Sequence, residues 1–77
     1  MKTTKKINTP FTSPTHHFIV SVLEGASVTV QISADGVTYE DLGAAVTGPE
    51  IIQVNDIVPG TWFKLSGTSA QEIPVIF

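Results

Sequence analysis

The chain has 77 residues, of which 42% are hydrophobic and 14% charged, and it contains no cysteine. This length allows one small domain, and the missing thiols exclude disulfide bonds and thiolate zinc sites as sources of stability. The formal net charge is −3 without any arginine, a composition that argues against nucleic-acid binding.

The first 15 residues predict an extended arm ahead of a single domain over residues 16–77. Pro10 and Pro14 disfavour helix in the residues before them, and the stretch shows no hydrophobic periodicity. Three of the four cations lie here, so we expect the arm to reach a partner surface. The arm residues expected to make this contact are Lys2, Lys5, Lys6, Ile7 and Phe11. We expect no secretory signal and no membrane span, because no apolar run is long enough.

Short β-branched and aromatic runs follow one another along the rest of the chain and predict an all-β fold. The expected strands are residues 16–23, 28–33, 37–42, 50–54 (with 57–58 as an extension), 61–66 and 72–77. Residues 43–47 fit either a strand or a loop. Turn residues separate these runs at the spacing of a small antiparallel sandwich or a jelly-roll-like barrel. Pro74 places the last strand at an edge or a bulge.

Asp35 and Gly36 lie between two extended runs and predict a tight β-hairpin, since glycine tolerates the positive φ of such turns. The surrounding residues are similar to the Asp box of sialidases, S-x-D-x-G-x-T-W. Here one residue is missing between Asp and Gly, and Tyr39 replaces Trp. In those families the motif shapes a turn, so the similarity predicts a structural element and no catalytic group.

The titratable side chains do not form a recognisable catalytic or metal-binding pattern. His16 and His17 are neighbours on a predicted strand and face opposite sides, so they could share an ion only around a symmetry axis. Acidic residues such as Asp35 and Glu40 lack the spacing of a calcium loop. The chain has no nucleophile elbow and no phosphate-binding glycine loop. We therefore expect no enzymatic activity, no metal and no cofactor.

Two aromatic residues outside the arm are further candidates for partner contacts. Trp62 and Phe63 point to opposite faces of their strand, so burial of Phe63 leaves Trp62 facing outward. We expect Trp62 in a subunit interface, with stacking of Trp62 and Tyr39 on a sugar as the alternative. Phe77 ends an apolar run and predicts a docked tail that completes its own sheet or a neighbour's. The apolar composition of so small a domain also predicts an oligomer.

The run VTVQISADGVTYEDLGAAVTG resembles a module of small structural proteins of tailed bacteriophages, which carry V-x-V-x-x-S-x-D-G-x-x-[WY]-x-x-L-G. The matching positions are Val28, Val30, Ser33, Asp35, Gly36, Tyr39, Leu42 and Gly43. The run PGTWFKL is similar to the strand that closes such domains, and together the resemblance covers roughly half the chain.

This resemblance implies a virion protein that is assembled in the host cytoplasm. The expected role is capsid decoration (cement), in which a β-rich homotrimer clamps subunits of the major capsid protein. The alternative is a carbohydrate- or protein-binding module on a phage tail or fibre. Neither role requires nucleic acid or a membrane as partner.

Overall fold

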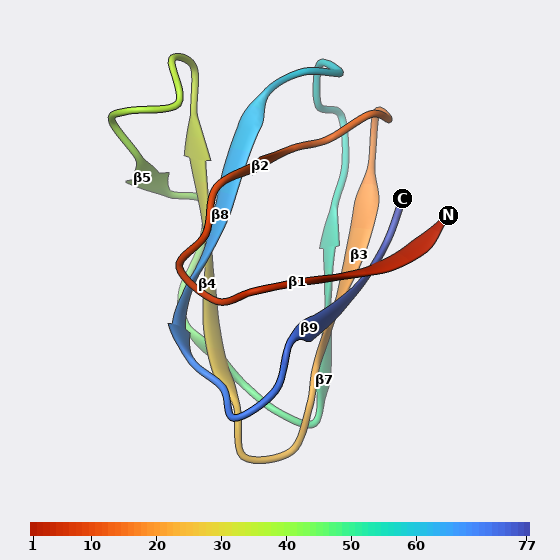
Figure 1. The fold of residues 1–77 in the computed structure, drawn as a ribbon, viewed down its shortest axis with the longest axis vertical. Coiled ribbons are helices and arrows are strands. Elements are labelled where there is room, and N and C mark those ends of the chain that lie inside the picture. The colour runs from red at the N-terminus through yellow and green to blue at the C-terminus, as the bar shows by residue number, and fades with distance from the viewer.

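The structure, a computed structural model, describes residues 1–77 and consists of strands and loops. The strands are β1 (Lys2–Lys5), β2 (Phe11–Thr12), β3 (Phe18–Val22), β4 (Ser27–Ser33), β5 (Glu40–Asp41), β6 (Val46–Thr47), β7 (Glu50–Val54), β8 (Trp62–Thr68) and β9 (Ile73–Ile76). They form two antiparallel sheets packed as a sandwich (Figure 1), which confirms the predicted all-β class. No helix of the length and hydropathy needed to cross a membrane is found.

The two sheets differ in how their strands are ordered. Sheet A has the order β1-β9-β3-β7, and sheet B has the order β2-β8-β4-β5 with β6 also paired to β4. The longest ladder joins β4 to β8, from the pair Ser27↔Thr68 to the pair Ser33↔Trp62. The chain passes from β3 in sheet A to β4 in sheet B through a turn at Gly25, where φ is 85°.

Alternating side chains from both sheets fill the space between them. Val20 and Val22 of β3 face Val28 and Val30 of β4, and all four are buried. The ring of Phe18 packs edge-on against Phe63 with 4.9 Å between centroids. Each such side chain contributes roughly 1.5–3 kcal/mol through burial. The buried cluster consists of Phe11, Phe18, Val20, Val22, Ala26, Val28, Val30, Val54, Ile57, Phe63, Leu65, Ile73 and Val75.

Residues 1–15 belong to the sandwich, which differs from the extended arm predicted ahead of residue 16. β1 pairs with β9 along its whole length. The chain then crosses to sheet B at Asn8, whose backbone N–H donates to the Leu65 carbonyl at 2.7 Å, and β2 pairs with β8. In Figure 1, β1 and β2 cross in front of the other strands. The prolines exclude helix but not strand, and the partner strands lie more than 45 residues away, where no local pattern indicates them.

The turn at Asp35 and Gly36 is longer than the two-residue hairpin predicted. Gly36 has the expected positive φ, 80°, but the next paired residue is Glu40, opposite Ile32. The connection therefore spans residues 33–39, and β5 has two residues instead of the predicted strand over 37–42. Side chains of the loop bind its backbone N–H groups, which removes those groups from a strand ladder.

Pro74 lies in an internal strand, not at the predicted edge or bulge. β9 has β1 on one side and β3 on the other, and its ladder with β3 ends at the pair Val20↔Val75. The ladder thus ends before it reaches Pro74, whose backbone nitrogen has no hydrogen to donate. Residues 57–58 are also not a strand, because Asp56 turns the chain with φ 58°.

Candidate functional site

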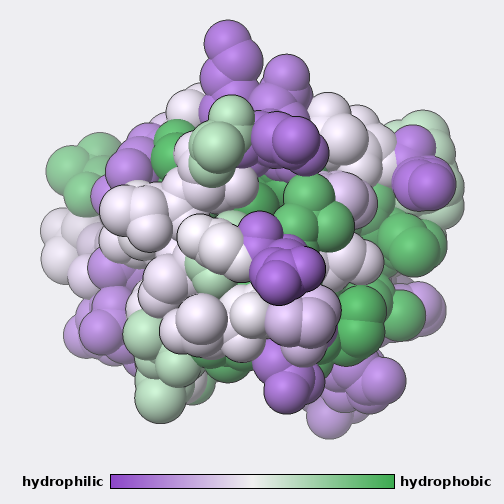
Figure 2. Space-filling view, turned by 90° about the horizontal axis from the view of Figure 1, so that it is seen from below, coloured by the Kyte–Doolittle hydropathy of each residue, from purple (hydrophilic) through white to green (hydrophobic).

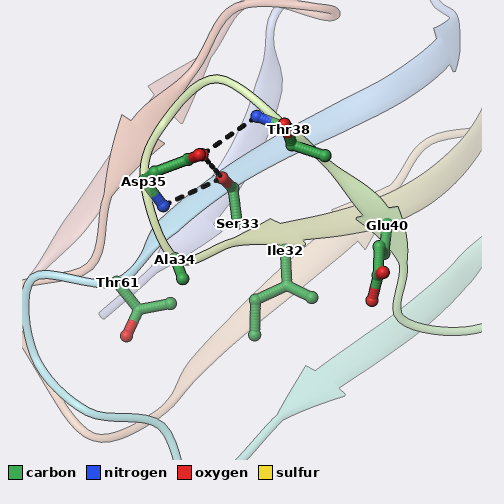
Figure 3. Close-up of a pocket in the computed structure, with 7 residues that line it drawn as sticks. All are labelled: Ile32, Ser33, Ala34, Asp35, Thr38, Glu40 and Thr61. Carbon is green, nitrogen blue, oxygen red and sulfur yellow. Dashed lines mark hydrogen bonds between the residues drawn. The ribbon is translucent and has the colours of Figure 1, made fainter.

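The loop of residues 33–39 is built on Ser33 and Asp35. Ser33 ends β4 and is buried, and its Oγ accepts from the Gly36 N–H at 2.9 Å and donates to Asp35 Oδ1 at 2.9 Å. The same Oδ1 accepts from the backbone N–H groups of Val37 at 2.8 Å and Thr38 at 2.9 Å. Figure 3 shows the part of this network that joins Ser33, Asp35 and Thr38. The residues that resemble an Asp box therefore hold the loop in shape.

These hydrogen bonds also decide what Asp35 can do chemically. The backbone N–H groups of Thr38 and Val37, and then the Ser33 hydroxyl, lower the pKa of Asp35. Each donor favours the ionised carboxylate. An ionised carboxylate whose one oxygen already accepts three hydrogen bonds serves as a structural acceptor and holds no proton to transfer near neutral pH.

Ionised Asp35 is expected to make stability depend on pH in acid. Because folding lowers this pKa below its ordinary value of 3.8, the charge stabilises the fold above that value, and the contribution is lost as pH falls through the folded-state pKa. Asp35→Asn cannot ionise, so its urea midpoint should lie below that of the natural chain at about pH 6 and approach it at about pH 2. A midpoint difference that stays constant across this range would contradict the role of the charge.

Trp62 and Tyr39 lie on the outer face of sheet B, where the loop folds back over them. The Trp62 side chain is 37% exposed, and its ring contacts Gly36, where an added Cβ would come within 3.0 Å of Cε2. The Tyr39 hydroxyl donates to the Gly36 carbonyl at 3.3 Å, and Lys64 Nζ lies 4.5 Å from the Tyr39 ring centroid. The outward orientation of Trp62 is confirmed, and both rings already have partners within the chain.

Ile7, Phe11 and Phe77 were expected to contact a partner, but they pack within their own chain. Phe11 is 6% exposed, and its ring centroid lies 6.2 Å from that of Phe77. Ile7 and Phe77 pack against the buried cluster. The Phe77 N–H donates to the Met1 carbonyl at 2.9 Å, so the tail is docked as predicted, on its own sheet. Because β1 and β2 join the sandwich, these side chains stabilise the single chain.

The three N-terminal lysines lie along β1 and directly after it. Lys2 and Lys6 are exposed. Lys5 Nζ is 5.1 Å from the Phe11 ring centroid and 5.7 Å from that of Phe77, so it covers the margin of the aromatic core. These cations lie together on the β1 side of the sandwich, where an acidic surface can approach them.

Two cavities lie at the margins of sheet B. The first, about 460 Å³, is lined by Ile32, Ser33, Ala34, Asp35, Thr38, Glu40 and Thr61 (Figure 3). The second, about 330 Å³, is lined by Val30, Leu42, Gly43, Ala44, Val46, Ile52, Gln53 and Val54. Five of the seven residues that line the first are polar, and among them Asp35 already accepts hydrogen bonds within the loop. The second is mostly apolar and opens between β6 and β7, so it suits an apolar side chain.

The fold brings together one surface that the sequence did not single out. The outer face of sheet A carries an apolar stripe formed by Ile19, Ile51, Pro74 and Ile76. Ile51 is 57% exposed and Ile76 is 41% exposed. Each residue of the stripe alternates along its strand with a residue that faces the core. The run EIIQV therefore indicates that one of its faces is apolar, but only the packed sheet shows which of its side chains face outward.

The structure thus offers two outward faces with different chemistry. Sheet A presents the apolar stripe, and sheet B presents Trp62, Tyr39 and Lys64 beside the loop of residues 33–39. Comparison of the chain with known protein families, curated proteins and solved structures finds no match.

Proposed function

We propose that this chain is a structural protein of a tailed-bacteriophage virion, a decoration protein that binds the capsid shell as a homotrimer. The observation that carries the proposal is the apolar stripe on sheet A. Ile19 pairs directly with Ile76, and Ile51 is a diagonal neighbour of Ile19 through its pairing with Ser21. Ile51 and Ile76 are exposed and Ile19 and Pro74 are half-buried, and apolar side chains gathered on an outer face in this way mark a protein-binding surface.

The class of partner follows from the resemblance of residues 28–43 to phage structural modules. In the structure Ser33, Asp35, Gly36 and Tyr39 of that motif all shape the loop. The motif then acts as a scaffold and leaves the sheet faces for binding. A sheet face with an apolar stripe fits a relatively flat surface of another protein, such as the junction between subunits of a major capsid protein.

The mechanism is burial of surface that a single small chain leaves exposed. Figure 2 views the end where β3 turns into β4, and hydrophobic residues reach the surface there between hydrophilic ones. Each square ångström of apolar surface buried against a shell stabilises the contact by about 25 cal/mol. Every bound copy therefore adds to the free energy needed to separate neighbouring shell subunits.

The chain is expected as a repeated component of purified particles from the virus whose genome encodes it, measured by quantitative mass spectrometry. Binding to particles that lack the chain then tests the stripe by co-sedimentation. Ile51→Asp should weaken binding by at least about tenfold, because it places a charge in the contact. Val37→Asp is the control, since Val37 is also exposed to solvent (82%, against 57% for Ile51) but lies on the loop. Absence of the chain from purified particles would refute the proposal.

A second candidate function is supported by Trp62, which keeps part of its ring exposed beside Tyr39 and Lys64. Such a face suits a carbohydrate- or protein-binding module on a phage tail or fibre. Trp62 is the only tryptophan, so its fluorescence reports on this face alone. A saturable change on titration with host-surface glycans would favour this function over capsid decoration.

A further inference from the structure

The two lateral sides of the sandwich carry opposite charge. The β1 side carries Lys2, Lys5 and Lys6, together with one acid, Glu72, whose carboxylate accepts from the Thr4 hydroxyl at 3.1 Å. The opposite side is formed by β5 and β7, which carry Glu40, Asp41 and Glu50. The remaining lysine, Lys64, lies on the outer face of sheet B against Tyr39. One side is therefore basic and the other acidic, and two copies placed side by side in the same orientation would bring these sides together.

The same two sides expose the long free edges of sheet A. β7 is the last strand of the sheet, and none of its five residues makes a backbone hydrogen bond outside the sheet ladders. Its sequence, EIIQV, contains no lysine, proline or bulge, and its one guard against pairing is the core-facing charge of Glu50, which an opposing lysine would neutralise. β1 is the outermost strand on the other side. The outer strands of sheet B, β2, β5 and β6, have only two residues each.

We propose that the β7 edge of one copy pairs with the β1 edge of a second copy, so that sheet A continues from copy to copy. Each strand of sheet A is antiparallel to its neighbours, so β1 and β7 run in opposite directions. A head-to-tail repeat therefore keeps every strand pair antiparallel. The inference deepens the self-association that the proposed function includes.

Two conditions together select one register for this pair of strands. The core-facing sides of β1 and β7 must align, and β1 must be paired over its full length. Glu50 lies opposite the buried Val22 and Lys5 lies opposite the buried Ile73, so both belong to the core-facing sides of their strands. Aligning these sides over the full length of β1 places Glu50 opposite Lys5 of the second copy and Gln53 opposite its Lys2. Opposite charges directly across a strand pair are stabilising. Pairing of two β1 edges would instead bring lysines of both copies together, and pairing of two β7 edges would bring the two acidic sides together.

The same register gives the apolar cavity an occupant. It places Met1 of the second copy opposite Val54, which lines the cavity of about 330 Å³ between β6 and β7. Met1 is 77% exposed, and by alternation with Thr3 and Lys5 its side chain projects to the core-facing side. A methionine side chain is flexible and fills irregular apolar spaces. One register thus joins an exposed apolar side chain with an apolar cavity.

Disulfide cross-linking tests the contact, because the natural chain has no cysteine. Lys2 and Gln53 are both exposed, and directly opposed residues in an antiparallel pair have Cα atoms roughly 4.5–5.5 Å apart, within reach of a disulfide. A mixture of Lys2→Cys and Gln53→Cys chains should form mainly the mixed disulfide, identified by peptide mapping. Lys2→Cys mixed with Thr68→Cys, on the far end of β8, is the matched control. Equal cross-linking in the control, or a Gln53→Cys dimer as the main product, would overturn the proposal.

Charge exchange provides a second measurement by sedimentation velocity at low salt. Glu50→Lys should weaken self-association by about tenfold, and adding Lys5→Glu should restore it. Glu24→Lys, at the turn between β3 and β4, should leave association unchanged. Circular dichroism verifies that each variant is folded. A monomer throughout the micromolar range would overturn the proposal, and it would leave the occurrence of the chain in virions a separate question, answered by mass spectrometry.

Discussion

Deletion of residues 1–12 is expected to abolish the cooperative folding of the remaining chain. The deletion removes β1 and β2, uncovers the edges of β9 and β8, and takes Phe11 out of the core. Loss of one buried phenylalanine side chain alone costs about 3–5 kcal/mol. The whole stability expected for a domain of this size is about 4–12 kcal/mol. Thermal unfolding followed by circular dichroism should therefore show no cooperative transition.

The control for this deletion is the double variant Lys2→Ala, Lys6→Ala. Both side chains are exposed, so the variant should unfold within a few degrees of the natural chain. A chain of residues 13–77 that still unfolds cooperatively near the natural midpoint would show that β1 and β2 are dispensable. The result also decides how partner binding is tested, since deletion removes the fold together with the lysines, whereas the alanine variant removes only charge.

Gly67→Ala is expected to destabilise the fold by roughly 3 kcal/mol, measured by urea unfolding. Gly67 pairs with Val28 in the longest ladder and has φ 132°, which L side chains rarely adopt. An added Cβ would also lie 2.1 Å from the Ser27 carbonyl oxygen, so the backbone must shift. The Asn8 side chain binds the backbone of Gly67 on both its N–H and its carbonyl, and this contact would be disturbed as well.

Gly43→Ala is the matched control for this substitution. No atom lies within 4 Å of a Cβ built at Gly43, and its φ is not in the positive region. The unfolding free energy should therefore change by less than about 0.5 kcal/mol. Equal effects of the two substitutions would mean that the close approach of β4 and β8 at Gly67 does not limit stability.

The proposed head-to-tail contact would also give one small domain a larger surface for binding. Heterologous contacts form rings when the rotation between copies closes, and open fibres when it does not. A closed trimer would place three apolar stripes on continuous sheets. The inward-facing Lys5 at the β1 edge restrains pairing with strands that lack an opposing acid, which favours Glu50 of another copy over unrelated strands.

Local patterns located most strands but not their lengths or partners. Alternation predicted β4 and β8 to within two residues, and the outward position of Trp62 followed from the burial of Phe63. Gly36 adopts the positive φ expected of it, yet the hairpin around it is a seven-residue loop, because Ser33 and Asp35 bind its backbone N–H groups. A turn dipeptide does not indicate whether side chains or a neighbouring strand will bind the backbone N–H groups around it.

Local patterns in the sequence were sufficient to predict the all-β class, the positions of the main strands and the outward face of β8, because alternation and turn residues act over a few neighbouring positions. Packing of the whole chain was needed to show that residues 1–15 complete both sheets, that Phe11 and Phe77 share one core, and that Pro74 lies in an internal strand. It also decided which lateral side is basic and which is acidic. Strand partners are selected by packing between segments far apart in the chain, and no local pattern encodes that selection.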